Sequence, residues 1–400
     1  MDRFDTDIVI AGGGVAGLTA TAALASAGFS VVCVDPAPPV TEAAADGADL
    51  RTTAFLQPAR DVLRAAGLWD RLLPHAAPLQ VMRIVDAGGP EPEARVTRDF
   101  DAAEISDDPF GWNLPNWLLR REMVARIAEL PAADFRPGTR FTGLFTRETE
   151  AVVTLSDGSR LRTRLVIGAD GRDSAVRQAA GIGVKTTRYG QSAVTFAVTH
   201  AAPHDNVSTE VHRTGGPFTL VPLPDHDGRP CSAVVWMVPD AEAARLLALP
   251  GADFAAEATA RSAHVAGPLH LASKRMRWPI ISQVARSMVA ERVALMAEAA
   301  HVVPPIGAQG LNMSLADLAK LVDLARAAPE RLGDAQMLEA YQRRRHAEVR
   351  LRVTGVDALN RASMAGSPLL RDLRAKGIEA LYAATPVRRS LMRLGLGAGR

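Results

Sequence analysis

Apolar residues and glycines alternate at the start of the chain in a pattern that predicts a strand, a helix and a second strand. Ile8–Ala11 is a short apolar run typical of a buried strand, Val15–Ala27 reads as a helix that ends at Gly28, and Ser30–Val34 is again strand-like. A strand, a helix and a strand in this order predict a βαβ unit.

The rest of the chain alternates between helical and strand-like patterns, with proline, glycine and aspartate between them. The expected elements are a helix at Gln57–Leu73, a loop at Pro109–Pro115, a helix at Trp117–Leu130, a hairpin of Ala151–Leu155 and Leu161–Ile167 with an Asp-Gly turn, a β-sheet lobe across Ser192–Met237, and helices from about Leu311 to the end. We therefore expect a discontinuous α/β domain with a β-sheet lobe inserted between its parts.

Length and composition indicate a globular protein with room for a buried ligand. The 400 residues exceed one typical core, and the apolar share of 48% with 22% charged residues is ordinary for a folded chain. A net charge of +2 without a Lys/Arg run argues against nucleic acid. Cys33 and Cys231 have no Cys or His neighbour at metal-ligand spacing, so we expect no metal site and no disulfide, in keeping with a reducing cytoplasm.

The uncharged stretch Ile8–Val34 is long enough to span a bilayer, but its glycines favour another interpretation. The cluster at residues 12–14, with Gly17 and Gly28, divides the stretch into strand, turn, helix and strand. The chain also begins with aspartates, which disfavours a signal peptide.

The first chemical motif is G-x-G-x-x-G at Gly12, Gly14 and Gly17, directly after a strand and at the start of a helix. Gly12 permits the tight turn, Gly14 lets a pyrophosphate approach the backbone, and Gly17 lets helix and strand pack closely. The N–H groups at the helix start favour the phosphate charge. Asp35 closes the second strand, where a carboxylate accepts hydrogen bonds from an adenosine ribose. An ordinary tight turn with a surface aspartate is the alternative.

Two further segments resemble motifs of the flavoprotein aromatic hydroxylases. A strand running into Asp170 and Gly171 resembles that family's Asp-Gly motif, which lies beside both FAD and the transient nicotinamide site. Residues 292–301 (RVALMAEAAH) resemble its Gly-Asp-Ala-Ala-His segment, and residues 304–312 (PPIGAQGLN) resemble Pro-x-x-Gly-x-Gly-x-Asn. The resemblance implies that an acid meets the flavin ribityl chain and that the glycine loop passes the isoalloxazine.

Shorter motifs resemble the ubiquinone-biosynthesis branch of the same family. They are Arg51-Thr52-Thr53-Ala54, where the family's arginine approaches FAD, then residues 189–193 (YGQSA) and residues 215–224, which begin GGP and end VPLP. All the motifs together span about Asp7 to Asp323 in the family's order. The chain therefore resembles FAD-dependent hydroxylases that act on ubiquinone precursors.

This resemblance implies an α/β fold, with a Rossmann-type FAD-binding domain, an inserted β-sheet substrate lobe and a helical C-terminal region. The expected segments are 1–74, 111–184 and 286–345 for FAD binding, 75–110 and 185–285 for the substrate lobe, and 346–400 for the helical region. The residues expected to bind FAD are Gly12, Gly14, Val15, Ala16, Gly17, Asp35, Arg51, Asp170, Gly171, Glu298, Gly307, Gly310, Leu311 and Asn312.

The family's chemistry needs no catalytic nucleophile from the protein, because the cofactor carries it. The expected reactants are NAD(P)H as transient reductant, O2 and a prenylated phenol or quinone precursor. His301 could be a general base, but a structural hydrogen-bonding role is the preferred interpretation because no partner carboxylate is evident.

One departure from the family concerns Ala297-Glu298, which stands where the family has Gly-Asp. Glu298 can still accept a hydrogen bond from a ribityl hydroxyl, and losing the glycine costs little if the local φ is negative. Weaker FAD binding is the expected cost, and a plain surface charge is the alternative role of Glu298.

Other functions remain open on the sequence alone. A flavin-dependent reductase or dehydrogenase of the same fold is one, and a non-catalytic flavin-binding member of a biosynthetic complex is another. Halogenation is disfavoured because Arg277-Trp278-Pro279-Ile280 lacks the W-x-W-x-I-P pattern, and a G-x-S-x-G hydrolase motif is absent from the sequence.

The last segment of the sequence allows two interpretations. After Glu379 there is no acidic residue, while Arg388, Arg389, Arg393 and Arg400 punctuate an apolar stretch. Such a segment could hold a cytoplasmic protein peripherally on an anionic membrane surface or a membrane-bound complex. Alternatively it is a final helix packed on the cofactor domain. No sequence feature selects an oligomeric state.

Overall fold

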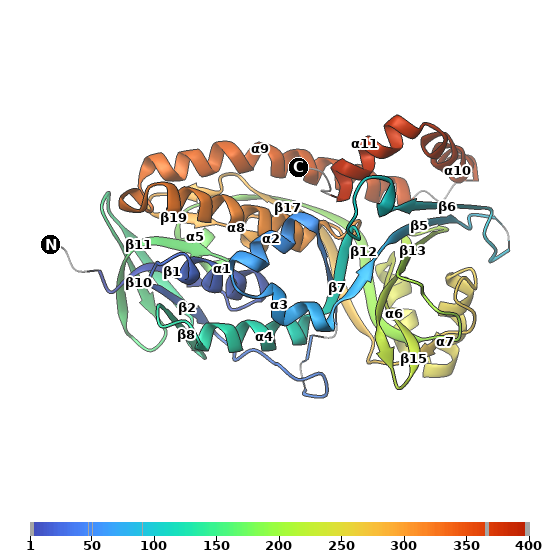
Figure 1. Ribbon diagram of the computed structural model, residues 1–400, viewed down its shortest axis with the longest axis horizontal. Coiled ribbons are helices and arrows are strands. Elements are labelled where there is room, and N and C mark those ends of the chain that lie inside the picture. The colour runs from blue at the N-terminus through green and yellow to red at the C-terminus, as the bar shows by residue number, and fades with distance from the viewer. Residues whose placement is uncertain (1–3, 47, 50, 90, 365–367, 397–400) are drawn as a thin grey trace.

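Three β-sheets with helices around them make up the structure, a computed structural model that describes residues 4–46, 48–49, 51–89, 91–364 and 368–396. The first sheet and its helices form one end of an elongated molecule, and the second sheet forms a lobe at the other end (Figure 1). The chain passes between these parts several times, so the α/β domain is discontinuous, as the sequence predicted.

The first sheet has eight strands, ordered β18-β19-β11-β1-β2-β8, with β10 beside β11 and β9 beside β10. Neighbours from β19 to β8 are parallel. The strands are β1 (Thr6–Ala11), β2 (Val31–Asp35), β8 (Ala133–Pro137), β9 (Phe141–Thr146), β10 (Ala151–Leu155), β11 (Arg160–Gly168), β18 (Val289–Ala290) and β19 (Val293–Leu295). Ala11 pairs with both Val34 and Gly168, so the segments that follow these strands emerge at one edge of the sheet. In parallel α/β sheets this edge binds ligands.

Helices cover the faces of this sheet. They are α1 (Val15–Ser26), α2 (Gln57–Ala65), α3 (Trp69–Leu72), α4 (Asn116–Ala128), α5 (Ala175–Ala179), α8 (Gln309–Ala327) and α9 (Ala335–Ser363). Alanine and leucine make α1 apolar all round, and it is buried from Gly17 to Ala25 between the sheet, α4 and α8. The predicted βαβ unit is confirmed. The segment boundary expected between residues 345 and 346 falls inside α9, which continues without a break from Ala335 to Ser363.

The lobe contains a nine-stranded sheet, ordered β20-β17-β12-β15-β14-β13-β5-β6, with β16 beside β12. Its strands are β5 (Val81–Asp86), β6 (Val96–Asp101), β12 (Val184–Thr199), β13 (Val207–His212), β14 (Pro217–His226), β15 (Arg229–Pro239), β16 (His270–Leu271), β17 (Met276–Ala285) and β20 (His301–Val302). Helices α6 (Asp240–Ala248) and α7 (Gly251–Arg261) cover one face. Phe196, Phe218, Trp236 and Phe254 pack together in this layer. The opposite face is left to the cavity described below.

A small third sheet, ordered β3-β7-β4, lies between the α/β domain and the lobe, the two bodies of the protein, and connects them. Its strands are β3 (Thr52–Leu56), β4 (Ala77–Leu79) and β7 (Gly111–Pro115). The prediction of a loop at Pro109–Pro115 is therefore wrong, because Gly111–Pro115 forms β7, the central strand of this sheet. The error has a physical reason: Pro109 precedes the strand and Pro115 is its last residue, so neither removes a hydrogen bond from the interior of the ladder.

The predicted helix at Gln57–Leu73 is also two helices rather than one. Gly67 has φ +70° just after α2, and the Leu68 N–H donates to the Leu63 carbonyl at 2.9 Å. This left-handed glycine cap ends α2 before the chain resumes as α3. Apolar periodicity continues through the break, which is why the pattern alone suggested a single helix. By contrast, the predicted Asp-Gly hairpin is confirmed as β10 and β11, with Gly158 at φ +83°.

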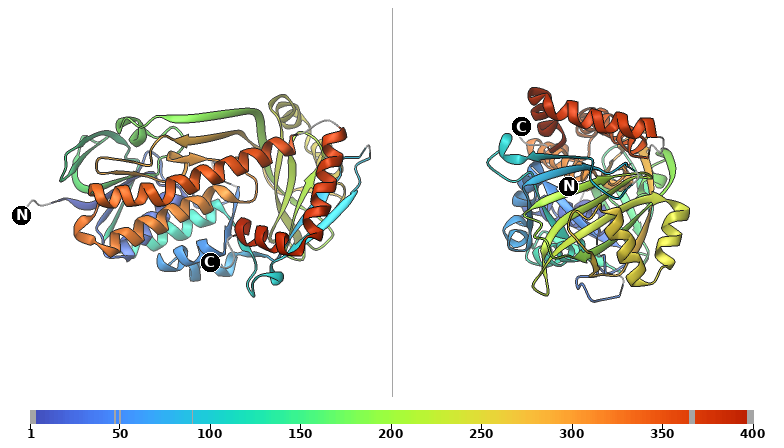
Figure 2. Two further views of the ribbon diagram at one scale, coloured as in Figure 1. Left: turned by 90° about the horizontal axis from the view of Figure 1, so that it is seen from above. Right: turned by 90° about the vertical axis from the view of Figure 1, so that its right-hand side faces the viewer.

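The C-terminal helices α10 (Pro368–Ala383) and α11 (Thr385–Leu396) lie along the lobe, and the end of α11 reaches the start of α8 (Figure 2). Met392 is 5% exposed in a cluster with Phe100 and Phe110. Arg388 pairs with Glu104 at 2.6 Å and stacks on the Tyr382 ring. The final helix contacts both parts of the protein: Met392 packs in the cluster at the lobe, and the Gly395 carbonyl accepts a hydrogen bond from Gln309 of α8 at 3.2 Å. The expectation that this helix packs on the cofactor domain is therefore only partly right. Arg400 lies outside the described residues.

Candidate functional site

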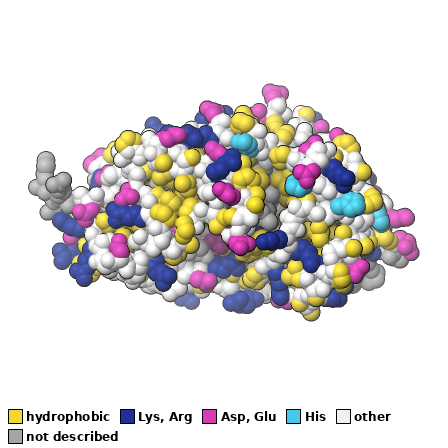
Figure 3. Space-filling view, turned by 90° about the horizontal axis from the view of Figure 1, so that it is seen from below, with side chains coloured by type: hydrophobic (Ala, Val, Ile, Leu, Met, Phe, Trp, Pro, Cys, Tyr) yellow, Lys and Arg dark blue, Asp and Glu magenta, His cyan; other side chains and the backbone are white. Residues whose placement is uncertain are grey.

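A cavity of about 1390 Å³ lies between the parallel edge of the first sheet and the open face of the lobe sheet. Its volume exceeds the range of about 300–1,000 Å³ that is usual for a ligand pocket. Seen from below, the molecule is hollowed near the middle of this face, with acidic and basic side chains around the hollow (Figure 3). Most of the predicted cofactor residues line the cavity: Gly12, Gly14, Val15, Ala16, Asp35, Arg51, Asp170, Gly171, Glu298, Gly307, Gly310 and Leu311.

The glycine turn between β1 and α1 is shaped by close backbone contacts. Gly12 has φ +114°, and a side chain on Gly17 would bring its Cβ within 1.8 Å of the Gly12 carbonyl oxygen. Gly17 thus serves helix-to-strand packing and is not among the described residues that line the cavity. A Cβ on Gly14 would meet nothing within 4 Å, so the space before α1 is open. No side chain caps this helix start, which leaves its N–H groups available for an anion.

Asp35 joins the second strand to the same turn. Its carboxylate accepts the Gly13 N–H at 2.6 Å and the Ala37 N–H at 2.9 Å. Each carboxylate oxygen keeps further acceptor capacity. Asp35 therefore fixes the turn and still offers an acceptor at the cavity wall, where an adenosine hydroxyl is expected.

The Asp170-Gly171 segment lies opposite the glycine turn. One carboxylate oxygen of Asp170 accepts the Val176 N–H at 3.0 Å, while the other is buried without a hydrogen-bond partner among the described residues. The buried Arg177 guanidinium donates to the carbonyls of Arg172 and Ala299, at 2.8 and 2.9 Å. Arg177 thus ties the Asp-Gly segment to the segment that carries Glu298.

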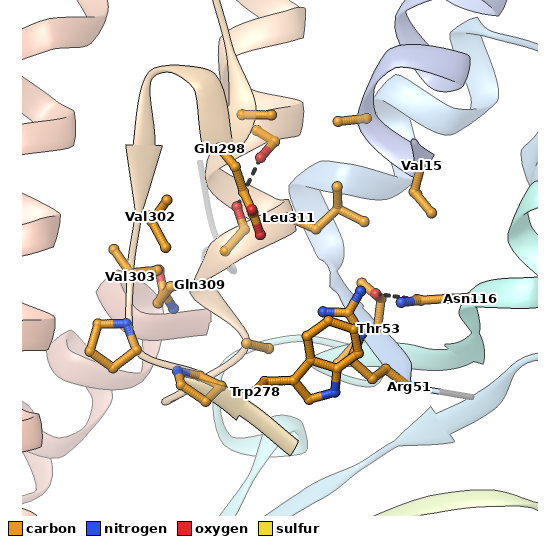
Figure 4. Close-up of a pocket in the computed structure, with 18 of the residues that line it drawn as sticks. Val15, Arg51, Thr53, Asn116, Trp278, Glu298, Val302, Val303, Gln309 and Leu311 are labelled. Atoms are coloured by element: carbon orange, nitrogen blue, oxygen red, sulfur yellow. Dashed lines mark hydrogen bonds between the residues drawn. The ribbon is translucent and has the colours of Figure 1, made fainter. Parts of the chain in front are cut away.

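Glu298 lies in the short 3-10 helix η3 (Ala297–Ala299), directly after β19. Its side chain is 49% exposed, and its carboxylate lies 3.7 Å from the Arg172 guanidinium. In Figure 4 Glu298 projects into the space between α1, which carries Val15, and the start of α8, where Gln309 lies. A solvated, partly paired carboxylate of this kind can accept hydrogen bonds from a polyhydroxyl chain.

Ala297 has φ +55°, so the condition under which losing the glycine would cost little is not met. An L-residue in this left-handed region costs roughly 1–2 kcal/mol. Ala308, at the start of α8, has the same φ of +55°. Two alanines therefore occupy strained positions at segments that border the cavity.

Behind the cavity, three side chains form a buried polar network that sequence reasoning missed. Asp317 of α8 accepts from His301 at 2.6 Å, from the Arg345 guanidinium of α9 at 2.8 Å and from the Ala297 N–H at 3.3 Å. His301 thus has the partner carboxylate that the sequence did not reveal, and its Nδ1 is buried without a partner among the described residues. Burial disfavours the charge on Arg345, but Asp317 and Glu348 outweigh it and raise the pKa of Arg345. The reason given for a structural role of His301, the lack of a partner carboxylate, is therefore wrong, although its hydrogen bond to the buried Asp317 is one that such a role uses.

Arg51 lies on the far side of the cavity from Glu298 and bridges the two bodies of the protein. Its guanidinium binds Asp49 through two hydrogen bonds of 2.8 and 2.7 Å and lies 4.0 Å from the centre of the Trp278 ring of β17 (Figure 4). Burial disfavours the Asp49 carboxylate, but hydrogen bonds from Arg51 and Asn116 outweigh it and lower the pKa of Asp49. Arg51 and Trp278 together close this side of the cavity.

Asn312 is not among the described residues that line the cavity. Its side chain instead accepts the Leu56 N–H at 2.8 Å and donates to the carbonyls of Ala54 and Ala308 at 2.7 Å. Asn312 therefore ties α8 and its loop to β3. We still propose that Asn312 contributes to cofactor binding, by positioning this loop.

The site suits a large polar ligand with an anionic centre. Among the described residues, three that line the cavity carry a buried polar atom without a partner: Asp170, His301 and Asn113. The open space at Gly14 faces the uncapped start of α1. The glycine turn and the Asp170-Gly171 segment form a cradle at one end of the cavity. The cavity is longer than a mononucleotide site requires, because it continues from this cradle to the lobe sheet and α9. A dinucleotide in the cradle and a second molecule against the lobe fit these features.

Residues 5–355 match the FAD binding domain family, and the chain belongs to this family. The predicted fold class and FAD as the cofactor are thereby confirmed. The chain is 35% identical over 396 residues to a ubiquinone hydroxylase, UbiL, of Rhodospirillum rubrum, covering 98% of this chain and 89% of that protein. It is 28% identical to the 3-demethoxyubiquinol 3-hydroxylase of Escherichia coli, covering 99% and 100% of the two chains. The predicted resemblance to the ubiquinone-biosynthesis hydroxylases is confirmed.

Solved structures share the fold. The p-nitrophenol 4-monooxygenase PnpA of Pseudomonas putida superposes with a TM-score of 0.80 at 20% identity, covering 100% of both chains. PqsL of Pseudomonas aeruginosa, in complex with 2-aminobenzoylacetate, superposes with a TM-score of 0.75 at 23% identity, covering 94% of this chain and 99% of that one.

Replacing Ala297 with glycine should stabilise the protein, because glycine adopts a positive φ without steric cost. We expect the free energy of unfolding in urea to rise by about 0.5–1 kcal/mol. Ala299→Gly is the matched control, since Ala299 is buried in the same short helix without a positive φ; it should lower stability. A loss of similar size in both variants would contradict the strain at Ala297.

Removing the Glu298 carboxylate should weaken FAD binding if the ribityl chain is held there. We expect Glu298→Ala to cost roughly 1.5–3 kcal/mol, the range for a hydrogen bond to a charged group. Glu298→Asp should be milder. Titration of FAD into cofactor-free protein measures the dissociation constant, and an unchanged value in the alanine variant would identify Glu298 as a plain surface charge.

Proposed function

We propose that this protein is an FAD-dependent monooxygenase that hydroxylates the aromatic ring of a prenylated ubiquinone precursor with NAD(P)H and O2. The observation that carries this proposal is the single cavity that joins the glycine and aspartate cradle to a wall of lobe strands. The full-length similarity to UbiL, named as a ubiquinone hydroxylase, supports the choice of substrate class.

We assign the cofactor residues by their positions in the cavity. The turn at Gly12–Ala16 would hold the pyrophosphate, Asp35 the adenosine ribose, Glu298 the ribityl chain, and the loop Gly307–Leu311 the isoalloxazine. Arg51 and the Asp170-Gly171 segment would border the cofactor from opposite sides. When bound, FAD supplies the redox chemistry. The residues of this chain orient the reactants and exclude water from them.

The outer part of the cavity suits an aromatic ring with an apolar chain. Leu79, Met82, Phe110 and Val221 line its lobe side. Where the cavity reaches α9 and α11, it is lined by Leu351, Leu359 and Leu391, which are 75%, 59% and 42% exposed. Exposed apolar side chains gathered at a cavity mouth are typical of a binding site for an apolar ligand. A prenyl chain could leave the cavity between these helices.

Turnover of a prenylated phenol tests the proposal. We expect the purified protein to carry non-covalent FAD, and we expect NAD(P)H and O2 to be consumed in equal amounts with one hydroxylated product. Mass spectrometry of the product after reaction under ¹⁸O2 should show one labelled oxygen. A reduced or desaturated product without the label would identify a reductase or dehydrogenase instead, and bound FAD without any NAD(P)H oxidation would identify a non-catalytic flavoprotein.

We also propose that the outer face of α11 contacts an anionic lipid surface or a membrane-bound complex. Arg393 is exposed on this helix, and Arg389 is exposed although it lies 3.7 Å from Glu104, while Arg388 is held by the same carboxylate. Among the described helices, none is both long and apolar enough to cross a bilayer. Each basic residue near an anionic surface contributes about 1 kcal/mol.

Liposome flotation tests the lipid contact. We expect binding to anionic but not neutral vesicles, and we expect it to be lost in the double variant Arg389→Glu/Arg393→Glu. The control is Arg343→Glu/Arg350→Glu, which makes the same charge change at exposed positions of α9. Equal flotation of the α11 variant and the unchanged protein would leave delivery of the substrate to partner proteins.

A further inference from the structure

A buried carboxylate lies in the lobe wall of the cavity, away from the residues assigned to the cofactor. Glu210 of β13 lines the cavity and is 7% exposed. Its carboxylate lies 2.8 Å from Nε2 of His212, two residues further along the same strand and on the same face. Glutamate is rarely buried to this extent unless it is paired.

The side chains next to Glu210 in the sheet are uncharged. Thr219 of β14 and Ile84 of β5 lie beside Glu210 in register, and Thr219 also lines the cavity. The neighbouring strands add Met82 and Val221 to the same wall. A hydroxyl group of a ligand at this wall would find Glu210 as its charged acceptor in low-dielectric surroundings, where such a hydrogen bond is strong.

The pair supports no backbone segment. Among the described residues the Glu210 and His212 side chains are bonded to each other, and Nδ1 of His212 is buried without a partner. This differs from the Asp317 network, which accepts a backbone N–H and so holds a loop. A buried pair that holds no other structural element and lines a cavity is a candidate for chemistry.

Charged groups lie between His212 and the surface. His212 lies in register with Asp86 on the adjacent strand β5. Asp86 is fully buried and binds Arg95 at 2.6 Å, and Arg95 reaches the exposed Asp372 of α10 at 2.8 Å. On the same face, Arg98 of β6 lies in register with Ile84 and pairs with Glu379 of α10 at 3.2 Å. Thr219 and Pro217 face the pair from β14. Charged side chains thus continue from the cavity wall to the surface.

We propose that Glu210 is a catalytic base that takes the proton of the substrate's phenolic hydroxyl, with His212 as its positioning residue and onward proton acceptor. The inference rests on the proposed function. An oxygen atom derived from O2, which the reduced cofactor would activate, forms the new C–O bond at the ring while its O–O bond breaks. Electron density leaves the hydroxyl oxygen, its O–H bond breaks, and the proton moves to Glu210, leaving a ring carbonyl. The ring then regains aromaticity: the C–H bond at the hydroxylated carbon breaks, that proton leaves to water, and the carbonyl oxygen takes a proton back from Glu210.

Replacing the carboxylate tests this assignment. Because general base catalysis contributes about 10²–10⁴-fold, Glu210→Gln should lower kcat at neutral pH by at least about a hundredfold. The KM for substrate should change less than kcat, and FAD affinity and melting temperature should stay as in the unchanged protein. Product formation should fall more than NAD(P)H oxidation, so peroxide should accumulate. Asp99→Asn, which removes an exposed carboxylate from β6 of the same lobe, is the control and should leave all these values unchanged.

Two readouts separate a base from a structural residue. The rate of Glu210→Gln should rise with pH as the phenol, with a pKa of about 10 in water, ionises by itself, while the unchanged enzyme should show no such rise. A ring-fluorinated substrate of lower pKa should restore most of the rate at neutral pH. His212→Asn should show the same behaviour with a smaller loss. Equal losses with both phenols at every pH, or a loss of FAD and stability, would overturn the assignment.

A binding experiment distinguishes failure of this inference from failure of the proposed function. The unchanged holoenzyme should bind the prenylated phenol about tenfold or more tightly than its methyl ether, the effect of a hydrogen bond to a charged group. Glu210→Leu should remove this preference. If the preference is present and depends on Glu210 but no product forms, the proposed function fails while Glu210 still recognises the hydroxyl. If product forms and no phenol preference depends on Glu210, the inference fails alone.

Discussion

The buried carboxylate of Asp317 determines how several distant segments meet behind the cavity. It accepts hydrogen bonds from His301, from Arg345 and from the backbone of Ala297, which belong to β20, α9 and η3. A buried charge is tolerated only when such partners satisfy it. Removing one partner would leave the remaining buried groups without full hydrogen bonding or charge compensation, which costs free energy of folding. The segment that carries Glu298 and the start of the loop at residues 303–308 are therefore positioned by a residue that never reaches the ligand. The strained φ of Ala297 is maintained by the same network.

The cavity depends on two bodies being held at a fixed distance. The chain passes between the α/β domain and the lobe through the strands of the sheet β3-β7-β4. The Arg51 side chain stacked on Trp278 joins the two parts by a side-chain contact. The C-terminal helix adds a third link. Gln309, the first residue of α8, donates to the Gly395 carbonyl at 3.2 Å and accepts from Arg352 at 2.9 Å. The walls of the cavity thus come from segments far apart in sequence, and no single segment makes a pocket alone.

The parts of the site that could be predicted from sequence are those whose chemistry is local. The glycine turn was readable because Gly12, Gly14 and Gly17 must lack side chains within one short segment, and the hairpin was readable from its Asp-Gly turn. The Asp317 network could not be predicted, since Arg345 is distant in sequence and comes close only through the packing of α8 on α9. One signal was present: Asp317 lies between apolar residues on a helix. The role of Glu210 could not be predicted from the sequence either. The register of the whole lobe sheet determines which face of β13 meets the cavity.

The order of strands in the first sheet has a consequence for how the chain folds. Val166 of β11 pairs with Val293 of β19, and the lobe strands β12 to β17 lie between them in the sequence. Contacts between parallel strands so widely separated carry a large loop-closure entropy before they contribute any stability, which slows folding. The edge that receives β19 must stay unpaired while the lobe's chain is sorted into its own sheet. During that interval β11 exposes hydrogen-bonding groups to other chains, so refolding at high protein concentration competes with aggregation.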